Sequence, residues 1–263
     1  MIIDFHTHAF PDAIAEKTIS FLADKARLEP YGNGTVDSLR KSSAEAGIDY
    51  SVVLPIATRS GQEDTINKFA AEINNTERIL SFGSIHPETE NYKEVLDKIK
   101  ASGLKGIKLH PDYQDFYIDD EKTYPMVEYA AKLGLIIVYH AGLDLGFREP
   151  IKNTPVRAKK MIKAIGYDKF VMAHMGAHAL YGDVMECLCG LDVYFDISFT
   201  MGKIDDAGFK EIIYSHGTDR ILFGTDNPWG GQKEDVKYFN SFDFPEKIRE
   251  KILYKNAMKL LQM

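Results

Sequence analysis

The stretch MIIDFHTH, residues 1–8, decides the fold prediction, because a short apolar run ends there in two histidines. Residues 2–5 have the apolar character of a buried strand. In a strand, residues i and i+2 point to the same side, so His6 and His8 face together while Thr7 faces away. Two imidazoles therefore lie at the carboxyl end of the first strand, where one cation could bind both.

Further apolar, β-branched runs follow along the chain, with helical patterns between them. The predicted strands span residues 2–5, 51–54, 80–84, 106–109, 135–139, 170–173, 193–195 and 221–223. The predicted helices span residues 12–26, 35–46, 63–74, 92–101, 121–132, 154–165, 183–189 and 205–215, and an amphipathic tail spans 245–261 to complete the outer ring. Strands that alternate with helices in this way favour an α/β fold, a (β/α)8 TIM barrel, in one domain over residues 1–263.

A doubly wound open sheet is the alternative arrangement of the same elements. The first turn from strand to helix, FHTHAFPD at residues 5–12, lacks the glycine pattern of a dinucleotide-binding sheet. The chain has 263 residues, close to the roughly 250 that are typical of a TIM barrel. We therefore expect the barrel.

Composition and charge exclude several classes of function. The net charge is -7 and the sequence contains no basic block, which disfavours a nucleic-acid binder. Cys187 and Cys189 cannot build a disulfide framework, and no signal-peptide pattern opens the chain, so we expect a cytoplasmic protein. No apolar run of about 18 residues predicts a membrane span. The aromatic-rich segment 238–244 could pack against a second copy, as in a homo-oligomer.

Candidate ligands gather at the predicted strand ends, where TIM-barrel enzymes carry their active groups. His140 ends the fifth run, His174 the sixth, and Asp226 follows the eighth. His140 and Asp226 could join the first two histidines in a site with three nitrogen ligands and one oxygen ligand. Zinc with an open water position fits such donors, and manganese is possible. The fourth run adds Lys108 and His110, as lining or as ligands of a second metal.

Five strings at strand ends carry a resemblance to a known family. They are DFHTH (4–8), GIKLHP (106–111), VYHAG (138–142), MAHMG (172–176) and FGTDNPW (223–229). Together they resemble the amidohydrolase superfamily, in particular the branch of metal-dependent hydrolases and aminocarboxymuconate-semialdehyde decarboxylase-like lyases. The resemblance implies that His6, His8 and His140 bind metal. It also implies that Asp226 is a further ligand or proton acceptor, and that His174 is an acid/base beside the metal or a ligand of a second one.

The resemblance also bears on the number of metal ions. Superfamily members with two metals use a carboxylated lysine on the fourth strand as a bridge, and Lys108 stands at that position. The branch that this chain resembles usually holds one metal. We expect one metal, with Lys108 as a charged side chain facing the site.

The leading functional hypothesis is a metal-dependent hydrolase of a small, carboxylate-bearing amide, ester or lactone, in which Asp226 takes a proton from water. The nearest rival is a non-oxidative decarboxylase on the same scaffold. A TatD-type deoxyribonuclease would have a glutamate on the fourth strand, and a non-catalytic metal-binding domain would not need Asp226 and His174. For the substrate, Arg59 and Arg148 could bind a carboxylate, and Trp229 could flank an apolar group.

Two histidines fall outside the predicted strand ends. His178 follows the sixth run and His216 lies near a helix end, so we expect both to be structural or solvated.

Overall fold

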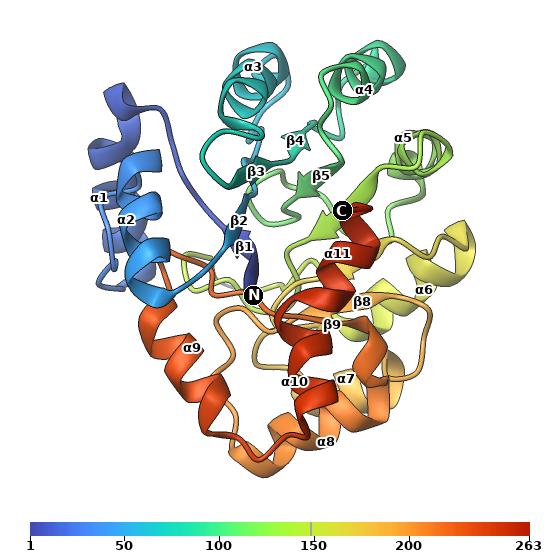
Figure 1. Ribbon diagram of the computed structural model, residues 1–263. Coiled ribbons are helices and arrows are strands. Elements are labelled where there is room, and N and C mark those ends of the chain that lie inside the picture. The colour runs from blue at the N-terminus through green and yellow to red at the C-terminus, as the bar shows by residue number, and fades with distance from the viewer. Residues whose placement is uncertain (148) are drawn as a thin grey trace.

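The computed structural model describes residues 1–147 and 149–263 (Figure 1). Arg148, predicted to bind a substrate carboxylate, lies outside the described residues. The strands of the described chain are β1 (Ile3–Thr7), β2 (Tyr50–Val53), β3 (Ile79–Ser81), β4 (Gly83–Ser84), β5 (Gly106–Leu109), β6 (Ile136–Tyr139), β7 (Phe170–Met172), β8 (Tyr194–Asp196) and β9 (Ile221–Leu222). Each predicted strand overlaps one of them, and the run 80–84 covers parts of both β3 and β4.

The strands form two parallel sheets that hydrogen bonds join into a ring. One sheet has the order β1-β2-β3 and the other runs from β4 to β9 in sequence. Phe82 connects β3 to β4, so these two short strands occupy a single strand position in the ring. The Phe82 N–H donates to the carbonyl of Val53 in β2 at 3.0 Å. The Phe5 N–H donates to the carbonyl of Phe223 at 2.9 Å, which joins β1 to the end of β9. In the described chain the ring therefore has eight strand positions, and the TIM-barrel prediction is confirmed.

Helices surround the ring, as Figure 1 shows. They are α1 (Asp12–Ala26), α2 (Val36–Ala46), α3 (Glu63–Ile73), α4 (Tyr92–Ala101), α5 (Tyr124–Lys132), α6 (Pro155–Ile165), α7 (Tyr181–Cys187), α8 (Asp206–His216), α9 (Gln232–Ser241), α10 (Glu246–Glu250) and α11 (Asn256–Leu261), with short turns η1 (Glu121–Thr123), η2 (Thr218–Arg220) and η3 (Lys251–Lys255). Thr154 caps α6 through its side-chain oxygen, and Gly166 ends it in the left-handed conformation. None of the helices in the described residues is long and apolar enough to cross a membrane.

Helix α9, which packs against α2, was not predicted from the sequence. Its stretch QKEDVKYFNS carries few apolar residues, so the helical period is weak. Phe239, Phe242 and Phe244 are buried in the chain's own core. The aromatic segment that we considered as a contact for a second copy therefore packs largely inside this chain.

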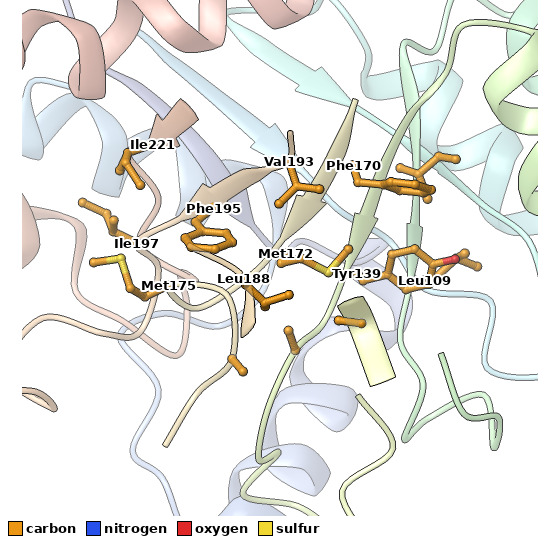
Figure 2. Close-up of a cluster of buried hydrophobic side chains, with 14 of the residues drawn as sticks. Leu109, Tyr139, Phe170, Met172, Met175, Leu188, Val193, Phe195, Ile197 and Ile221 are labelled. Carbon is orange, nitrogen blue, oxygen red and sulfur yellow. The ribbon is translucent and has the colours of Figure 1, made fainter. Parts of the chain in front are cut away.

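The core has an outer and an inner layer. Figure 2 shows part of the outer layer, in which apolar side chains from the strands, such as Tyr139 and Phe195, meet residues such as Leu188 that follow the helices. The inner layer collects side chains from around the ring, including Phe5 and Val138, together with Leu260 of α11. Removing this apolar surface from water is the main stabilising contribution to the fold.

The C-terminal helix α11 covers one end of the ring rather than completing its outer circle as predicted. The Lys105 ammonium, just before β5, contacts the carbonyl of Leu261. Asn256 donates to the carbonyls of Thr218 and Ile221 at 2.8 Å, where β9 begins. These contacts close the amino-terminal end of the barrel, so its carboxyl end remains as the open face.

A bulge in β1 turns His6 toward the inside of the ring. Relative to β2, β1 has one extra residue between Asp4 and Thr7. Phe5 belongs to the inner core, so strict alternation along the strand would direct His6 outward. Bulges re-aim side chains beside active sites, and this one turns His6, and with it His8, toward the inside of the ring.

Candidate metal centre

The carboxyl ends of the strands open into a cavity of about 430 Å³. Its polar floor holds the side chains of His6, His8, Lys108, His110, His140, Asp144, His174 and Asp226. Its walls are mainly apolar and include Phe10, Leu22, Leu54, Leu143, Phe199 and Trp229. The strand-end residues predicted from the sequence thus meet in one cavity.

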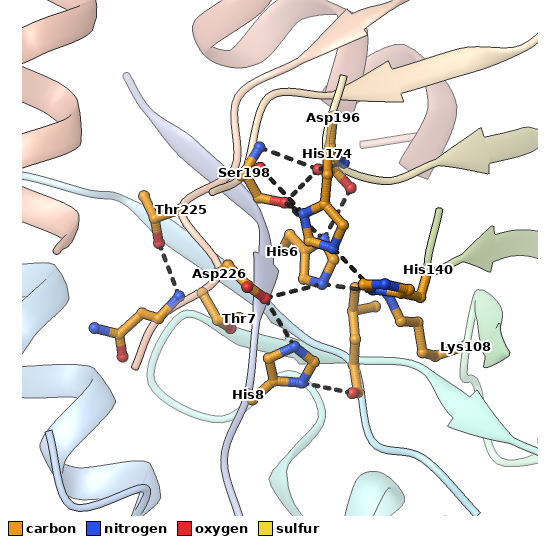
Figure 3. Close-up of polar contacts among 12 residues, drawn as sticks. His6, Thr7, His8, Lys108, His140, His174, Asp196, Ser198, Thr225 and Asp226 are labelled. Carbon is orange, nitrogen blue, oxygen red and sulfur yellow. Dashed lines mark hydrogen bonds and ion pairs between the residues drawn. The ribbon is translucent and has the colours of Figure 1, made fainter. Parts of the chain in front are cut away.

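His6, His8 and Asp226 converge at the floor (Figure 3), and we call them the metal-side group. The Asp226 Oδ1 atom lies 3.0 Å from His8 Nε2 and 3.3 Å from His6 Nε2. All three side chains are buried or nearly so. Two imidazole nitrogens and one carboxylate oxygen at these separations match the first ligands of a zinc or manganese site.

The hydrogen bonds on the far sides of the two rings show which nitrogens carry lone pairs. His6 Nδ1 lies 2.9 Å from the Asp196 carboxylate, and His8 Nδ1 lies 3.1 Å from the carbonyl of Leu54. Both partners only accept, so each Nδ1 donates its proton away from the floor and each ring turns its Nε2 toward Asp226. Two lone pairs and a carboxylate oxygen then face one another, an arrangement that a cation between them would satisfy. The residues therefore fit a divalent metal.

Asp196 and Ser198 hold the rings of the floor in place. The Asp196 carboxylate, at the end of β8, accepts from His6 Nδ1 at 2.9 Å and from the backbone N–H of His174 at 3.1 Å. Ser198 Oγ donates to Asp196 and lies 3.0 Å from both His6 Nδ1 and His174 Nδ1. Partners of this kind fix the tautomer and the plane of a ligand ring. Neither residue was predicted from the sequence.

Lys108 adds a buried cation to the floor. Its ammonium group lies 3.2 Å from His6 Nε2, and the side chain is 1% exposed. Burial lowers the pKa of Lys108 to about 8, against the opposing effects of Asp196, Asp226 and Asp144. Lys108 thus places a buried basic nitrogen at the floor of the cavity.

Burial also sets the protonation of the histidines. Desolvation lowers the pKa of His6, His140 and His174 well below the ordinary value, so these rings are neutral. Neutral imidazole is the form that binds metal. Desolvation raises the pKa of Asp226, while its contact with His8 opposes the shift.

Two residues of the floor have left-handed backbone conformations, which are uncommon outside glycine. The φ angle is 66° at Asp226 and 58° at His174. The Asp226 N–H donates to the His6 carbonyl at 2.7 Å, so the turn after β9 is tied to β1. Strained backbone of this type concentrates at functional sites.

His140, predicted as a metal ligand, belongs to a different group of side chains. With His110 and Asp144 it forms a second cluster of potential ligands, which we call the remote group. His140 Nδ1 lies 3.0 Å from His174 Nε2. The structure thus brings three of the four predicted ligands together and places His140 beside them, behind His174.

The other predicted contacts divide between the cavity and the surface. Trp229 lines the cavity. Arg59 is exposed and lies outside the cavity lining. His178, expected to be structural or solvated, is 7% exposed and lines the cavity. His216 is buried and stacks on Phe195, with ring centroids 3.7 Å apart.

The fold and the floor define a TIM-barrel protein with a candidate His/Asp metal site at the carboxyl ends of its strands. Comparison of the sequence with protein families agrees with this class: the amidohydrolase family matches residues 3–263, so the chain belongs to that family. No curated protein sequence matches the chain.

Solved structures share the fold at low sequence identity. A TIM-barrel protein from Bordetella bronchiseptica is 20% identical, with a TM-score of 0.78 over 99% of this chain and 98% of that one. A dihydroxybenzoic acid decarboxylase from a Polaromonas species, with bound manganese and 2-nitroresorcinol, is 18% identical, with a TM-score of 0.72 over 99% and 96%. A putative 2-pyrone-4,6-dicarboxylic acid hydrolase from Pseudomonas putida is 14% identical, with a TM-score of 0.69 over 99% and 97%.

Proposed function

We propose that this protein is a metal-dependent hydrolase that cleaves an amide, ester or lactone bond in a small molecule. The observation that carries the proposal is the convergence of His6 Nε2, His8 Nε2 and Asp226 Oδ1 at the floor of a closed-ended cavity. These atoms would hold the metal, with zinc as the first choice and manganese as the alternative. A divalent ion bound there supplies Lewis acidity, which polarises a carbonyl and acidifies water.

The chain's own residues supply the proton transfers. The Asp226 carboxylate takes the proton of the attacking water as oxygen adds to the substrate carbonyl. The Lys108 ammonium, beside His6, stabilises the negative charge that develops on the carbonyl oxygen. The proton that Asp226 has taken then passes to the bare Nε2 of His174, which gives it to the leaving atom. Its Nδ1 is held by the Ser198 carbonyl at 3.1 Å, which directs Nε2 toward His140 and the cavity.

The substrate is small and partly apolar, because aromatic and aliphatic side chains line the upper cavity. Among the described lining residues, Lys25 and Lys108 are the cations that could meet a substrate carboxylate. Arg59 lies outside the lining, so we assign the role proposed for it to these lysines. We also propose that the protein acts on a soluble metabolite in the cytoplasm rather than on nucleic acid or at a membrane.

Non-oxidative decarboxylation is the second candidate. The apolar walls favour it, because a carboxylate stripped of water by such walls gains by leaving as neutral CO2. The decarboxylase from Polaromonas offers a precedent on this fold. In this version the bond from the carboxylate to carbon breaks, its electron pair stays on the carbon, and a protonated Asp226 or His174 delivers a proton there.

A paired screen decides between the two reactions. Small amides, esters and lactones are followed by acid release, and aromatic carboxylic acids by CO2 release, with protein loaded with zinc or manganese. Asp226→Asn should lower turnover by roughly 10³-fold in either reaction while metal content stays near the wild-type value. Asp183→Asn, an exposed carboxylate on α7, is the matched control. A fully active Asp226→Asn variant would refute the role of this residue.

A further inference from the structure

A second cavity of about 270 Å³ adjoins the first, whose floor holds the metal-side group. Phe199 and Trp229 line both cavities, so these two side chains form the partition between them. The other walls of the second cavity include Tyr31, Met201 and Tyr238. Of the described residues that line it, none belongs to the metal-side group. The second cavity is therefore a separate space beside the candidate metal centre.

Phe199 has an unusual backbone conformation for an aromatic residue. Its φ angle is 53°, in the left-handed region that favours glycine. Such a conformation is costly and persists only where the surrounding structure fixes it. Hydrogen bonds tie down both neighbours of Phe199: the Ser198 N–H donates to Asp196 Oδ1 at 3.1 Å, and Thr200 Oγ1 donates to the Ser198 carbonyl at 3.0 Å. The segment that holds the floor thus also fixes the direction of the Phe199 ring.

The Phe199 ring contacts residues of both cavities. Its centroid lies 5.4 Å from that of His178 and 6.5 Å from that of His174, with planes 64° and 75° apart. Edge-to-face pairs of this kind are favourable. The Lys203 ammonium lies over the same ring, 3.9 Å from its centroid. The two histidines line the first cavity and Lys203 lines the second, so the ring stands between them.

The position of this ring bears on the shape of the substrate. A leaving group that accepts a proton from His174 lies beside that imidazole, and the Phe199 ring lies on the far side of the same imidazole from His6, whose ring centroid is 5.1 Å from that of His174. Phe199 is partly exposed and lines two cavities, so its ring does more than fill a buried core. A larger group in this direction would meet the ring before it reached the second cavity.

We propose that Phe199 is a specificity-determining residue, which limits the size of the leaving group beside His174 and closes the second cavity to the substrate. The inference rests on the proposed function in one respect, namely that the leaving atom lies beside His174. Without the ring, the two cavities would join. The second cavity would then accept a flat apolar group, because the aromatic rings of Tyr31, Trp229 and Tyr238 line it.

Equilibrium binding of two carboxylic acids to metal-loaded protein tests the proposal without turnover. Benzoate has one ring, and 3-phenylbenzoate carries a second ring that extends sideways from the first. Titration calorimetry of wild type should show benzoate binding at least about tenfold more tightly, because the Phe199 ring excludes the second phenyl group. Phe199→Gly removes the ring and accepts a φ of 53° without strain. It should bind 3-phenylbenzoate at least about tenfold more tightly than wild type does.

A matched control removes the same ring from another wall. Phe10 lines the first cavity, but it is not among the described residues that line the second. Phe10→Gly should therefore keep the wild-type preference for benzoate. An equal gain for 3-phenylbenzoate in Phe10→Gly would mean that any enlargement of the first cavity admits the second ring, and the proposal would be wrong.

The remaining outcomes also decide the question. Equal affinities of wild type for the two acids would overturn the proposal, as would Phe199→Gly with no gain for 3-phenylbenzoate, or no binding of either acid to either protein. If Phe199→Gly does not fold, Phe199→Leu decides, because its smaller side chain should give part of the gain. The expected binding pattern beside a failed screen for hydrolysis would count against the proposed function alone.

Discussion

The metal-side and remote groups contain the same residue types, two histidines and one aspartate, in one cavity, yet they differ in geometry. The His6 and His8 rings meet at 68° with centroids 5.2 Å apart, so their Nε2 atoms approach one oxygen from different directions. The His110 and His140 rings lie 9° from parallel. A ligand set is therefore defined by where the lone pairs point rather than by composition.

The difference originates in atoms outside both groups. The Asp196 carboxylate and the Leu54 carbonyl accept hydrogen bonds from Nδ1 of His6 and His8, which leaves both Nε2 atoms bare. In the remote group, the Tyr113 N–H gives His110 the opposite tautomer, and only His140 keeps a bare Nε2. The metal-side group thus turns two bare nitrogens toward one carboxylate oxygen, whereas the remote group has one bare nitrogen.

The largest expected effect is loss of the metal, and it tests the comparison directly. The double variant His6→Ala/His8→Ala removes two of the three converging atoms, so its metal content should fall from about one equivalent per chain to near zero. Activity should disappear with it. His110→Ala, from the remote group, should keep about one equivalent. Elemental analysis of protein purified without chelator measures all three.

Other stoichiometries would break the comparison. About two equivalents in wild type, with one lost in His110→Ala, would mean that the remote group also binds metal and that its stacked rings reorient. No metal in wild type, even after reloading, would contradict the assignment of the metal-side group and the proposed function with it.

Much of the metal-side group follows from the sequence. His6 and His8 stand two residues apart at the end of an apolar run, and Asp226 follows the last one, so the barrel rule places them at one end. The fold could also be predicted, because each strand position of the barrel appears in the sequence as a short apolar run. The sequence also predicts that His6 and His8 face together, but the β1 bulge that lets both Phe5 and His6 face inward has no signal in the strand pattern.

The remote group and the supporting residues were harder to predict. Asp144 lies in the loop after β6, and only the path of that loop brings it to His110. Asp196, by contrast, follows the predicted strand 193–195 directly, so the strand-end rule applied to that strand would have found it. Ring planes and tautomers depend on backbone carbonyls such as Leu54, which no residue pattern encodes.

A smaller effect, on metal affinity, is expected from weakening the contact between Asp196 and the His6 ring. Asp196→Asn keeps the shape of the side chain but weakens its hold on the His6 Nδ1 proton. Metal affinity should fall by about 10- to 100-fold, as is usual when such a partner is lost. Competition with a chelator measures it. Asp144→Asn is the control from the remote group and should keep wild-type metal affinity. Equal losses in the two variants would show that the groups act as one site.

The smallest effect concerns His216, a buried histidine outside both groups. Its Nε2 donates to the Val193 carbonyl at 2.9 Å and its ring stacks on Phe195. Burial lowers the pKa of His216 to about 4, from the ordinary 6.5. The unfolded chain therefore binds the proton more readily, so His216 makes the folded protein less stable as pH falls below about 6.5. Between pH 7 and pH 5 the loss is about 2 kcal/mol.

His216→Gln removes the titration while keeping a donor for Val193. Urea unfolding at pH 7 and pH 5, with equal metal content, should show a pH-dependent loss about 2 kcal/mol smaller in the variant than in wild type. The same loss in both proteins would mean that His216 titrates normally. The expected difference would show that burial alone keeps an imidazole neutral. Neutrality then cannot distinguish a metal ligand from a core histidine, and the direction of the bare nitrogen must.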